Sequence, residues 1–413
     1  MTEGRDGERA RQLEMSIAHG DQHLSSKGLI SAFRTLRDPI FLILAPAVFV
    51  LLEYVYAYKA TDVGFDFAGT LWKPAQAWLD GLPIYPEPTR IAVEIGNPSV
   101  YPPLFILLLS PLVALPLQVA AWVWLGVLAA SVAAALWIVG VHDWRCYVLA
   151  VSSPVVLQGL MLGNLTVFLV LLTALAWRYR HRALAAGVAV GTAVAAKLFV
   201  WPLLIWLVLT KRYQAAAWAL GSAALLVLVP WAIVGFDGLL DYPALLRETQ
   251  DVYAIRSDSV ASVVAGLGAS TTVAVVACWV AGLVLVALAI WLSRKEDSDR
   301  RVFTALVAAG IVASPIAWPN YASLLFVPIA IRWPRLAPAW FFGYAIWLAG
   351  LLPRPVATDA PGRPAGVPEM AWELSHAVPA AGKAFGIVAT VLLVTAALIV
   401  RRRPPSRSAI HVD

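Results

Sequence analysis

The chain has 413 residues, of which 60% are apolar and only 14% are charged. Soluble globular domains carry about 25% charged residues, so this composition excludes an ordinary soluble fold. The net charge of +6 does not indicate nucleic-acid binding, because the basic residues occur in short clusters between apolar runs. Such clusters are typical of the cytoplasmic loops of membrane proteins.

Residues 1–38 are charged and lack both the apolar core and the cleavage site of a signal peptide, so we expect a cytosolic tail. The first membrane span is predicted at about 39–58. It runs outward because Arg34 and Arg37 precede it. The polar, proline-rich segment 59–100 that follows is expected to be an external loop.

Apolar runs then continue to about residue 400 and predict an all-α polytopic membrane protein with about twelve crossings. Further external loops are expected at 236–270 and 353–382. The basic tail 401–413 places the C-terminus in the cytoplasm, like the N-terminus. One transmembrane domain over 39–400, in the plasma membrane, accounts for this pattern. Its segments after the first loop are 101–117, 119–141, 146–160, 165–177, 183–209, 214–235, 271–293, 302–317, 320–331, 336–352 and 383–400.

Two of these apolar regions are interrupted. Segment 183–209 either crosses once or forms two short helices that meet near Lys197. The first alternative places the basic cluster 178–182 outside, against the charge rule, whereas the second keeps it inside. The region 302–331 is broken by Pro315 and Pro319 and predicts a short hairpin. Broken backbone at membrane depth is tolerated where it is buried or lines a cavity, so both breaks are candidate site elements.

Charged residues in or beside a membrane span are costly and indicate function. Asp66 follows the first span by about eight residues and suits a general base at the outer surface. The alternative is a solvated loop aspartate. Lys197 interrupts an apolar stretch and could pair with a lipid phosphate. The alternative is a lysine that extends its ammonium to the membrane surface. Trp72 and Trp318 could stack on a sugar or belong to the interfacial aromatic belt.

The two cysteines, Cys146 and Cys278, lie in apolar segments and are predicted to be buried side chains. The sequence contains no zinc-ligand spacing, phosphate-binding loop or dinucleotide fingerprint. We therefore expect neither a cofactor nor a metal.

The order of the motifs carries a family resemblance. Asp66-Phe67, Trp72, Gly81 with Tyr85, and Tyr101-Pro102-Pro103 follow one another after the first span. This opening resembles that of glycosyltransferase family 87, membrane enzymes of the GT-C class that take sugars from polyprenyl phosphates. Later elements resemble the family pattern too, although Asn320 and Tyr321 stand where the family often has histidine. The matching positions are Asp66-Phe67, Trp72, Gly81, Tyr85, Tyr101-Pro102-Pro103, Gly163-Asn164, Lys197 with Pro202, Ser257-Asp258-Ser259 and Ser314-Pro315 with Trp318.

The resemblance implies an inverting hexosyltransferase with its active site on the external face. Asp66 would be the catalytic base, and Lys197 and Arg256 would hold the donor phosphate. The donor would be a polyprenyl-phosphate sugar, and the acceptor a glycolipid or cell-envelope glycan among the membrane lipids, with no nucleic acid involved. The residues expected to bind substrate are Asp62, Trp72, Tyr101, Asn164, Asp258, Trp318, Asn320 and Tyr321.

Several functions stay open. Mannose is the first choice of sugar and arabinofuranose the second, since both occur in the family. A lipid or glycan transporter shares the polytopic plan, but it predicts paired inverted repeats, which the sequence does not show. A non-catalytic membrane scaffold leaves Lys197 and the aspartates unexplained.

Overall fold

The computed structural model describes residues 47, 63–296, 298–350, 356–367 and 369–400. Within these residues the regular elements are helices, and the β contact is an isolated bridge between Val356 and Ala377. The all-α prediction is confirmed for this part of the chain. The predicted tails 1–38 and 401–413, and the first span 39–58 apart from Ala47, lie outside the described residues.

Four described helices are long and apolar enough to cross a membrane. They are α7 (Leu117–Ile138), α13 (Tyr213–Ile233), α16 (Thr271–Ser293) and α21 (Ala381–Ile399). A fifth candidate is a pair bent by 55°, α8 (Trp144–Val151) and α9 (Pro154–Leu162). A membrane protein is therefore supported by length and composition, while the predicted count of about twelve crossings is not confirmed.

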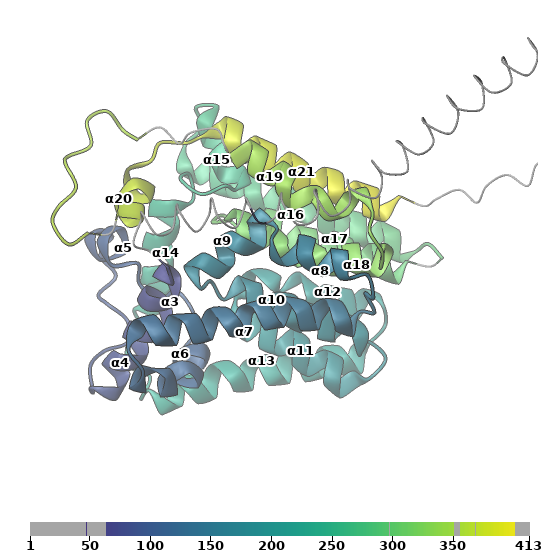
Figure 1. The fold of residues 1–413 in the computed structure, drawn as a ribbon, viewed down its shortest axis with the longest axis horizontal. Coiled ribbons are helices and arrows are strands. Elements are labelled where there is room, and N and C mark those ends of the chain that lie inside the picture. The colour runs from purple at the N-terminus through teal and green to yellow at the C-terminus, as the bar shows by residue number, and fades with distance from the viewer. Residues whose placement is uncertain (1–46, 48–62, 297, 351–355, 368, 401–413) are drawn as a thin grey trace, which may run out of the picture. The chain divides into compact units, whose positions relative to one another are not determined.

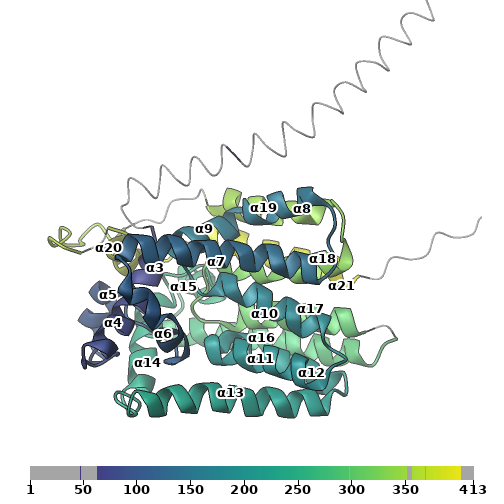
Figure 2. The ribbon, with the colours of Figure 1, turned by 60° about the horizontal axis from the view of Figure 1, so that its bottom comes forward.

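Shorter helices fill the space between the long ones. Helix α10 (Thr166–Arg178) packs against α7 and α11 (Ala183–Ala196), and α11 packs against α13 (Figure 2). Small residues permit the close approach of α11 and α13: a Cβ on Gly191 would lie 2.5 Å from the carbonyl oxygen of Ala219. The other short elements are α6 (Leu104–Leu109), η3 (Ser110–Ala114), α12 (Pro202–Leu209), η6 (Pro338–Phe341) and α19 (Phe342–Gly350).

Both interrupted regions are broken in the structure. Helix α11 ends at Ala196, Lys197 is extended, and the turn η4 (Leu198–Val200) leads into α12. The two-helix alternative for 183–209 is therefore confirmed. In the second region, α17 (Asp299–Ala313) ends before the first proline, and the chain resumes as η5 (Pro319–Leu325) and α18 (Phe326–Arg332).

The three predicted external loops contain helices that pack on one another (Figure 1). Helix α5 contacts α14 of the second loop and α20 of the third. The residue ranges are α3 (Phe65–Phe67), η2 (Ala68–Trp72), α4 (Lys73–Leu79), α5 (Arg90–Gly96), α14 (Tyr242–Tyr253), α15 (Val260–Gly266) and α20 (Glu369–His376).

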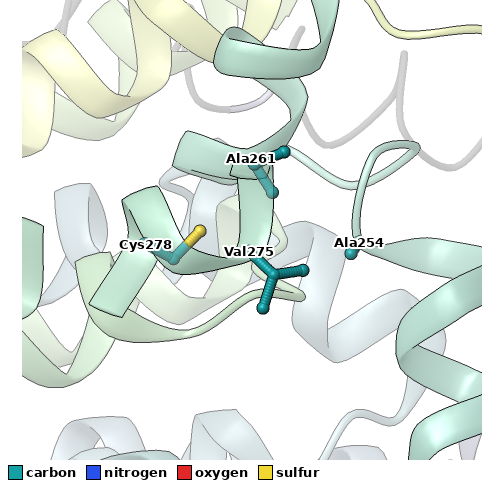
Figure 3. Close-up of a cluster of buried hydrophobic side chains, with 5 residues drawn as sticks. Ala254, Ala261, Val275 and Cys278 are labelled. Carbon is teal, nitrogen blue, oxygen red and sulfur yellow. The ribbon is translucent and has the colours of Figure 1, made fainter. Parts of the chain in front are cut away.

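A small apolar cluster anchors the second loop to the first turns of α16. Ala254 and Ala261 pack with Val275 and Cys278, and the four side chains are 0–5% exposed (Figure 3). Cys146 and Cys278 are both free and buried, which confirms the sequence prediction for them. Burial of these side chains stabilises the loop segment that carries Arg256 and Asp258.

At the other end of the helices, a single carboxylate joins three elements. Asp299 accepts hydrogen bonds from Arg212 at 2.7 and 2.9 Å and from the Trp206 indole at 2.8 Å. Arg180 lies 3.3 Å away. Burial opposes ionisation, but the partners outweigh it and hold the pKa of Asp299 below its usual value. This network ties α10, α12 and α17 together.

Candidate active site

Asp66 lies in a short turn that is held from several sides. Gly64 adopts φ 79° before it, and the Gly64 amide donates to the carbonyl of Met161 at 2.6 Å. Phe67 is fully buried and stacks on Trp124 with the ring centroids 6.2 Å apart. The Thr70 hydroxyl donates to the Asp66 carbonyl at 2.6 Å. The backbone of Asp66 is therefore fixed, and the residue as a whole is half-buried.

Asn164 lies in the turn between α9 and α10. Gly163 ends α9 with φ 68°, and the Asn164 amide donates to the carbonyl of Gly159 at 2.8 Å, as in a Schellman ending. The Trp124 indole donates to the Gly163 carbonyl at 2.8 Å. A Cβ on Gly163 would lie 2.7 Å from the Cβ of Phe67, so the two turns touch here.

A chain of hydrogen bonds joins Asp66 to Lys197. Asn164 donates from Nδ2 to Oδ2 of Asp66 at 2.6 Å. Its Oδ1 accepts from the Lys197 ammonium at 3.4 Å, and Lys197 also donates to the Thr166 hydroxyl at 2.7 Å. Lys197, at the break between α11 and α12, therefore contacts the turn between α9 and α10.

Aromatic rings enclose the Lys197 ammonium, which leaves the residue 8% exposed. Nζ lies 4.3 Å from the ring centroid of Tyr321, 5.3 Å from Tyr101 and 5.8 Å from Phe199. Tyr321 and Phe199 stack with centroids 4.5 Å apart. We call these residues the Asp66 cluster: Asp66, Tyr101, Asn164, Thr166, Lys197, Phe199 and Tyr321.

Burial raises the pKa of the Asp66 carboxyl above its usual value. The hydrogen bond from Asn164, the charge of Lys197 and the amide of Asn97 act in the opposite direction. A carboxylate with a raised pKa is a better proton acceptor when ionised, which suits general-base chemistry.

Asn320 lies on the same short element as Tyr321 and is fully buried. Its side-chain amide makes no hydrogen bond to any described residue. Its Cβ would be 3.2 Å from a Cβ on Gly159, which places it against α9. A buried amide without partners costs about 1–3 kcal/mol, so Asn320 has unused hydrogen-bonding capacity beside the Asp66 cluster.

Arg256, Asp258 and Trp318 form a second group, in which the Asp258 backbone amide donates to the carbonyl of Ala317 at 2.7 Å. Arg256 lies 3.6 Å from Glu94, and Asp258 lies 3.3 Å from Lys383 of α21. The ring of Trp318 meets that of Tyr253 edge-on at 6.4 Å. The Tyr321 amide donates to the Trp318 carbonyl at 2.9 Å, so η5 links this group to the Asp66 cluster. The two cations predicted to hold phosphate thus have different partners, although Tyr253 lies near both Arg256 and Asp66.

An apolar groove begins at the second group. Asp258 and Trp318 line one part of it, and its cavity volume is about 20 Å³. Side chains of α15, α17 and α21 form most of the rest, together with Ser259, Ala317 and Ala322. They include Val260, Ile311, Val312, Ile387, Val388 and Val391.

The structure brings some of the sequence-predicted site residues together and adds others. Asp66, Tyr101, Asn164, Lys197 and Tyr321 lie in one cluster, and their functional roles stay predictions. Trp72 is half-buried in η2, one helical turn beyond the Asp66 turn, and Asp62 lies outside the described residues. Thr166 and Phe199 were not predicted; their proximity in sequence to Asn164 and Lys197 is the signal that could have identified them. In the described ranges, no group of three His, Cys, Asp or Glu residues could hold a metal ion.

Comparison with known proteins identifies the family of this chain. The sequence model of glycosyltransferase family 87 matches residues 100–315. A curated relative, the polyprenol-phosphate-mannose-dependent alpha-(1-2)-phosphatidylinositol mannoside mannosyltransferase of Mycobacterium tuberculosis, is 27% identical over 289 residues. The alignment covers 60% of this chain and 65% of that relative, just under two thirds of its length. No solved structure matches the chain significantly. Because the family match spans more than half of its residues, the chain belongs to glycosyltransferase family 87.

Proposed function

We propose that this protein transfers a sugar, mannose in the first instance, from a polyprenyl-phosphate carrier to a glycolipid or cell-envelope glycan. The observation that carries the proposal is the Asp66 cluster, in which a buried carboxylate is held between family motifs and linked through Asn164 to a buried cation. The mannose carrier named for the mycobacterial relative supports the choice of donor. Arabinofuranose is the alternative sugar.

The proposed reaction inverts the anomeric centre in one displacement. Asp66 accepts the proton of an acceptor hydroxyl, and the hydroxyl oxygen forms a bond to the anomeric carbon. The bond from that carbon to the carrier oxygen breaks, and polyprenyl phosphate leaves with the electron pair. Asp66 then releases its proton to water. No nucleotide takes part.

The remaining polar residues would bind the two substrates. Arg256 pairs through Nη1 with Glu94 at 3.6 Å and makes no hydrogen bond from that atom to a described residue, so it would exchange this pair for a phosphate oxygen. Lys197 was predicted for the same phosphate and stays a candidate. Residues proposed to contact the sugars are Asp62, Trp72, Tyr101, Asn164, Asp258, Trp318, Asn320 and Tyr321.

The apolar groove is proposed to take the prenyl chain of the donor. Its lining is mostly aliphatic, it lies along the candidate span α21, and its polar end adjoins Trp318, the residue before η5, which carries Tyr321. A prenyl chain there would bring its phosphate toward Arg256.

Val388→Trp is expected to raise the donor KM by about tenfold, equivalent to ~1.4 kcal/mol, because the indole fills the groove. The acceptor KM should stay near wild type. Leu393→Trp is the matched control, because Leu393 lies on the same helix and is 70% exposed. Steady-state kinetics in detergent with varied donor concentration compares the two variants. Equal donor KM values for both would mean that the prenyl chain of the donor does not bind in the groove.

The full topology is part of the proposal: about twelve crossings, cytoplasmic termini, and the Asp66 cluster at the external face of the plasma membrane. The basic clusters support it, and the Asp299 network would then lie at the cytoplasmic side. A short re-entrant element such as η5 between spans fits a site at the membrane boundary.

A cysteine at position 90 should be labelled by an impermeant maleimide in intact cells. Arg90 is exposed at the start of α5, and both native cysteines are buried, which keeps the background low. The exposed Lys295, changed to cysteine, is the control and should react only after permeabilisation. Labelling of position 295 but not of position 90 in intact cells would mean the opposite orientation in the membrane, with the Asp66 cluster on the cytoplasmic side.

The proposed function is tested by incubating the purified protein with polyprenyl-phosphate mannose, polyprenyl-phosphate arabinofuranose and candidate glycolipid acceptors. Release of polyprenyl phosphate together with a lengthened glycolipid supports the proposal and identifies the sugar. Movement of carrier across a vesicle membrane without release would instead support a transporter.

A further inference from the structure

A single side-chain amide, that of Asn164, lies between the Asp66 carboxylate and the Lys197 ammonium. We infer that Asn164, Thr166 and Lys197 form a positioning relay that keeps the Asp66 carboxylate ionised and in one orientation. Its use in catalysis rests on the proposed function, but the relay itself does not. Lys197 acts through Asn164 in this assignment, and not as a ligand of the donor phosphate.

The amide of Asn164 can point only one way. Its Oδ1 faces two donors, the Thr166 backbone amide at 2.9 Å and the Lys197 ammonium at 3.4 Å. Its Nδ2 must then face Asp66, to which it donates at 2.6 Å. The amide dipole is thereby aligned between a cation and an anion and stabilises both charges.

The lysine is held as firmly as the amide. Two of its three donors are directed at Thr166 and Asn164. The rings of Tyr101, Phe199 and Tyr321 surround the ammonium within 5.8 Å, which stabilises a cation and excludes water. With 8% exposure, the ammonium has little surface left for a phosphate.

The charged and polar groups that face Asp66 determine the proton affinity of its carboxyl. They are Asn97 next to η2, Asn164, Lys197, and the phenols of Tyr101, Tyr253 and Tyr321. Phenols normally titrate near pH ~10 and stay neutral below neutral pH. Lys197 is therefore the charged group among them that favours the ionised carboxylate.

The sign of the effect follows directly. A nearby cation lowers a carboxyl pKa, so its removal raises the pKa of Asp66, and more of the base is protonated at a given pH. The acidic limb of kcat/KM should move to higher pH by about one unit or more in Lys197→Met, within the range expected for an opposite charge at close distance. Lys197→Arg keeps the charge and should move it less.

The test reads Asp66 directly and does not need activity. Infrared difference spectra of the solubilised protein are recorded between pH steps, and the protonated-carboxyl band that Asp66→Asn abolishes is assigned to Asp66. Its midpoint should move upward in Lys197→Met and, by a smaller amount, in Thr166→Val. Thr173→Val is the matched control on the same helix, because the Thr173 hydroxyl is buried and makes no hydrogen bond to a described residue.

The outcomes separate the two ideas. An upward shift without any sugar transfer would support the relay and overturn the proposed function. An unchanged midpoint in Lys197→Met, with a raised donor KM, would overturn the relay and return Lys197 to the phosphate. Should Lys197→Met fail to fold, the comparison of Thr166→Val with Thr173→Val still tests the relay. Equal midpoints of the Asp66 carboxyl band in those two variants would overturn the relay.

Discussion

Asp66→Asn is expected to lower sugar transfer by ~10²–10⁴, the usual cost of removing a general base. Asparagine keeps the shape of the side chain, and its amide oxygen can still accept the hydrogen bond from Asn164. The variant should therefore fold and bind donor while losing the step that deprotonates the acceptor. Release of polyprenyl phosphate from saturating donor and acceptor is the measurement, with donor binding determined in parallel.

Two neighbouring aspartates make this result interpretable. Asp80 is exposed at the end of α4, so Asp80→Asn should keep wild-type transfer. Asp62→Asn is expected to lose far less than Asp66→Asn. Wild-type rates in Asp66→Asn would remove the base from the proposed mechanism, and a dead Asp62→Asn beside an active Asp66→Asn would move it by four residues.

Gly163→Ala is expected to lower transfer by about 100-fold, because small misplacements of reacting groups have effects of that size. Gly163 has φ 68°, and an added Cβ would lie 2.7 Å from the Cβ of Phe67. Relief of this clash must push the Asn164 turn away from the Asp66 turn. The left-handed backbone adds about 1–2 kcal/mol of strain.

Gly140→Ala distinguishes the effect of the clash with Phe67 from the effect of backbone strain. Gly140 also has a left-handed backbone, with φ 93°, but a Cβ there would have nothing within 4 Å. Both variants should lose thermal stability, and only Gly163→Ala should lose transfer beyond that. Equal rates in the two would mean that contact between the turns does not hold the site together.

The predictions from sequence succeeded where the cause is local. Apolar runs predicted helices because backbone groups in lipid must be paired within their own segment. The prolines and the lone Lys197 predicted breaks, which the structure places between α11 and α12 and between α17 and η5. The Asp66, Asn164 and Lys197 motifs were identified one by one, since each is marked by a charge or an amide next to an apolar run.

Only the tertiary structure decided which of these residues meet. Residues 66, 164 and 197 lie far apart in the chain, and no periodicity specifies that their turns touch at Gly163 and Phe67. Pairing of Arg256 with Glu94 in a second group, apart from Lys197, likewise depends on how α5 packs near α14. Thr166 carries no charge and looks like any helix-start threonine; its role follows from the 2.7 Å hydrogen bond that it accepts from Lys197. The sequence by itself thus determined the helices, their breaks and the candidate groups, which arise from local polarity, whereas the contacts between distant turns depend on side-chain packing that only the folded chain specifies.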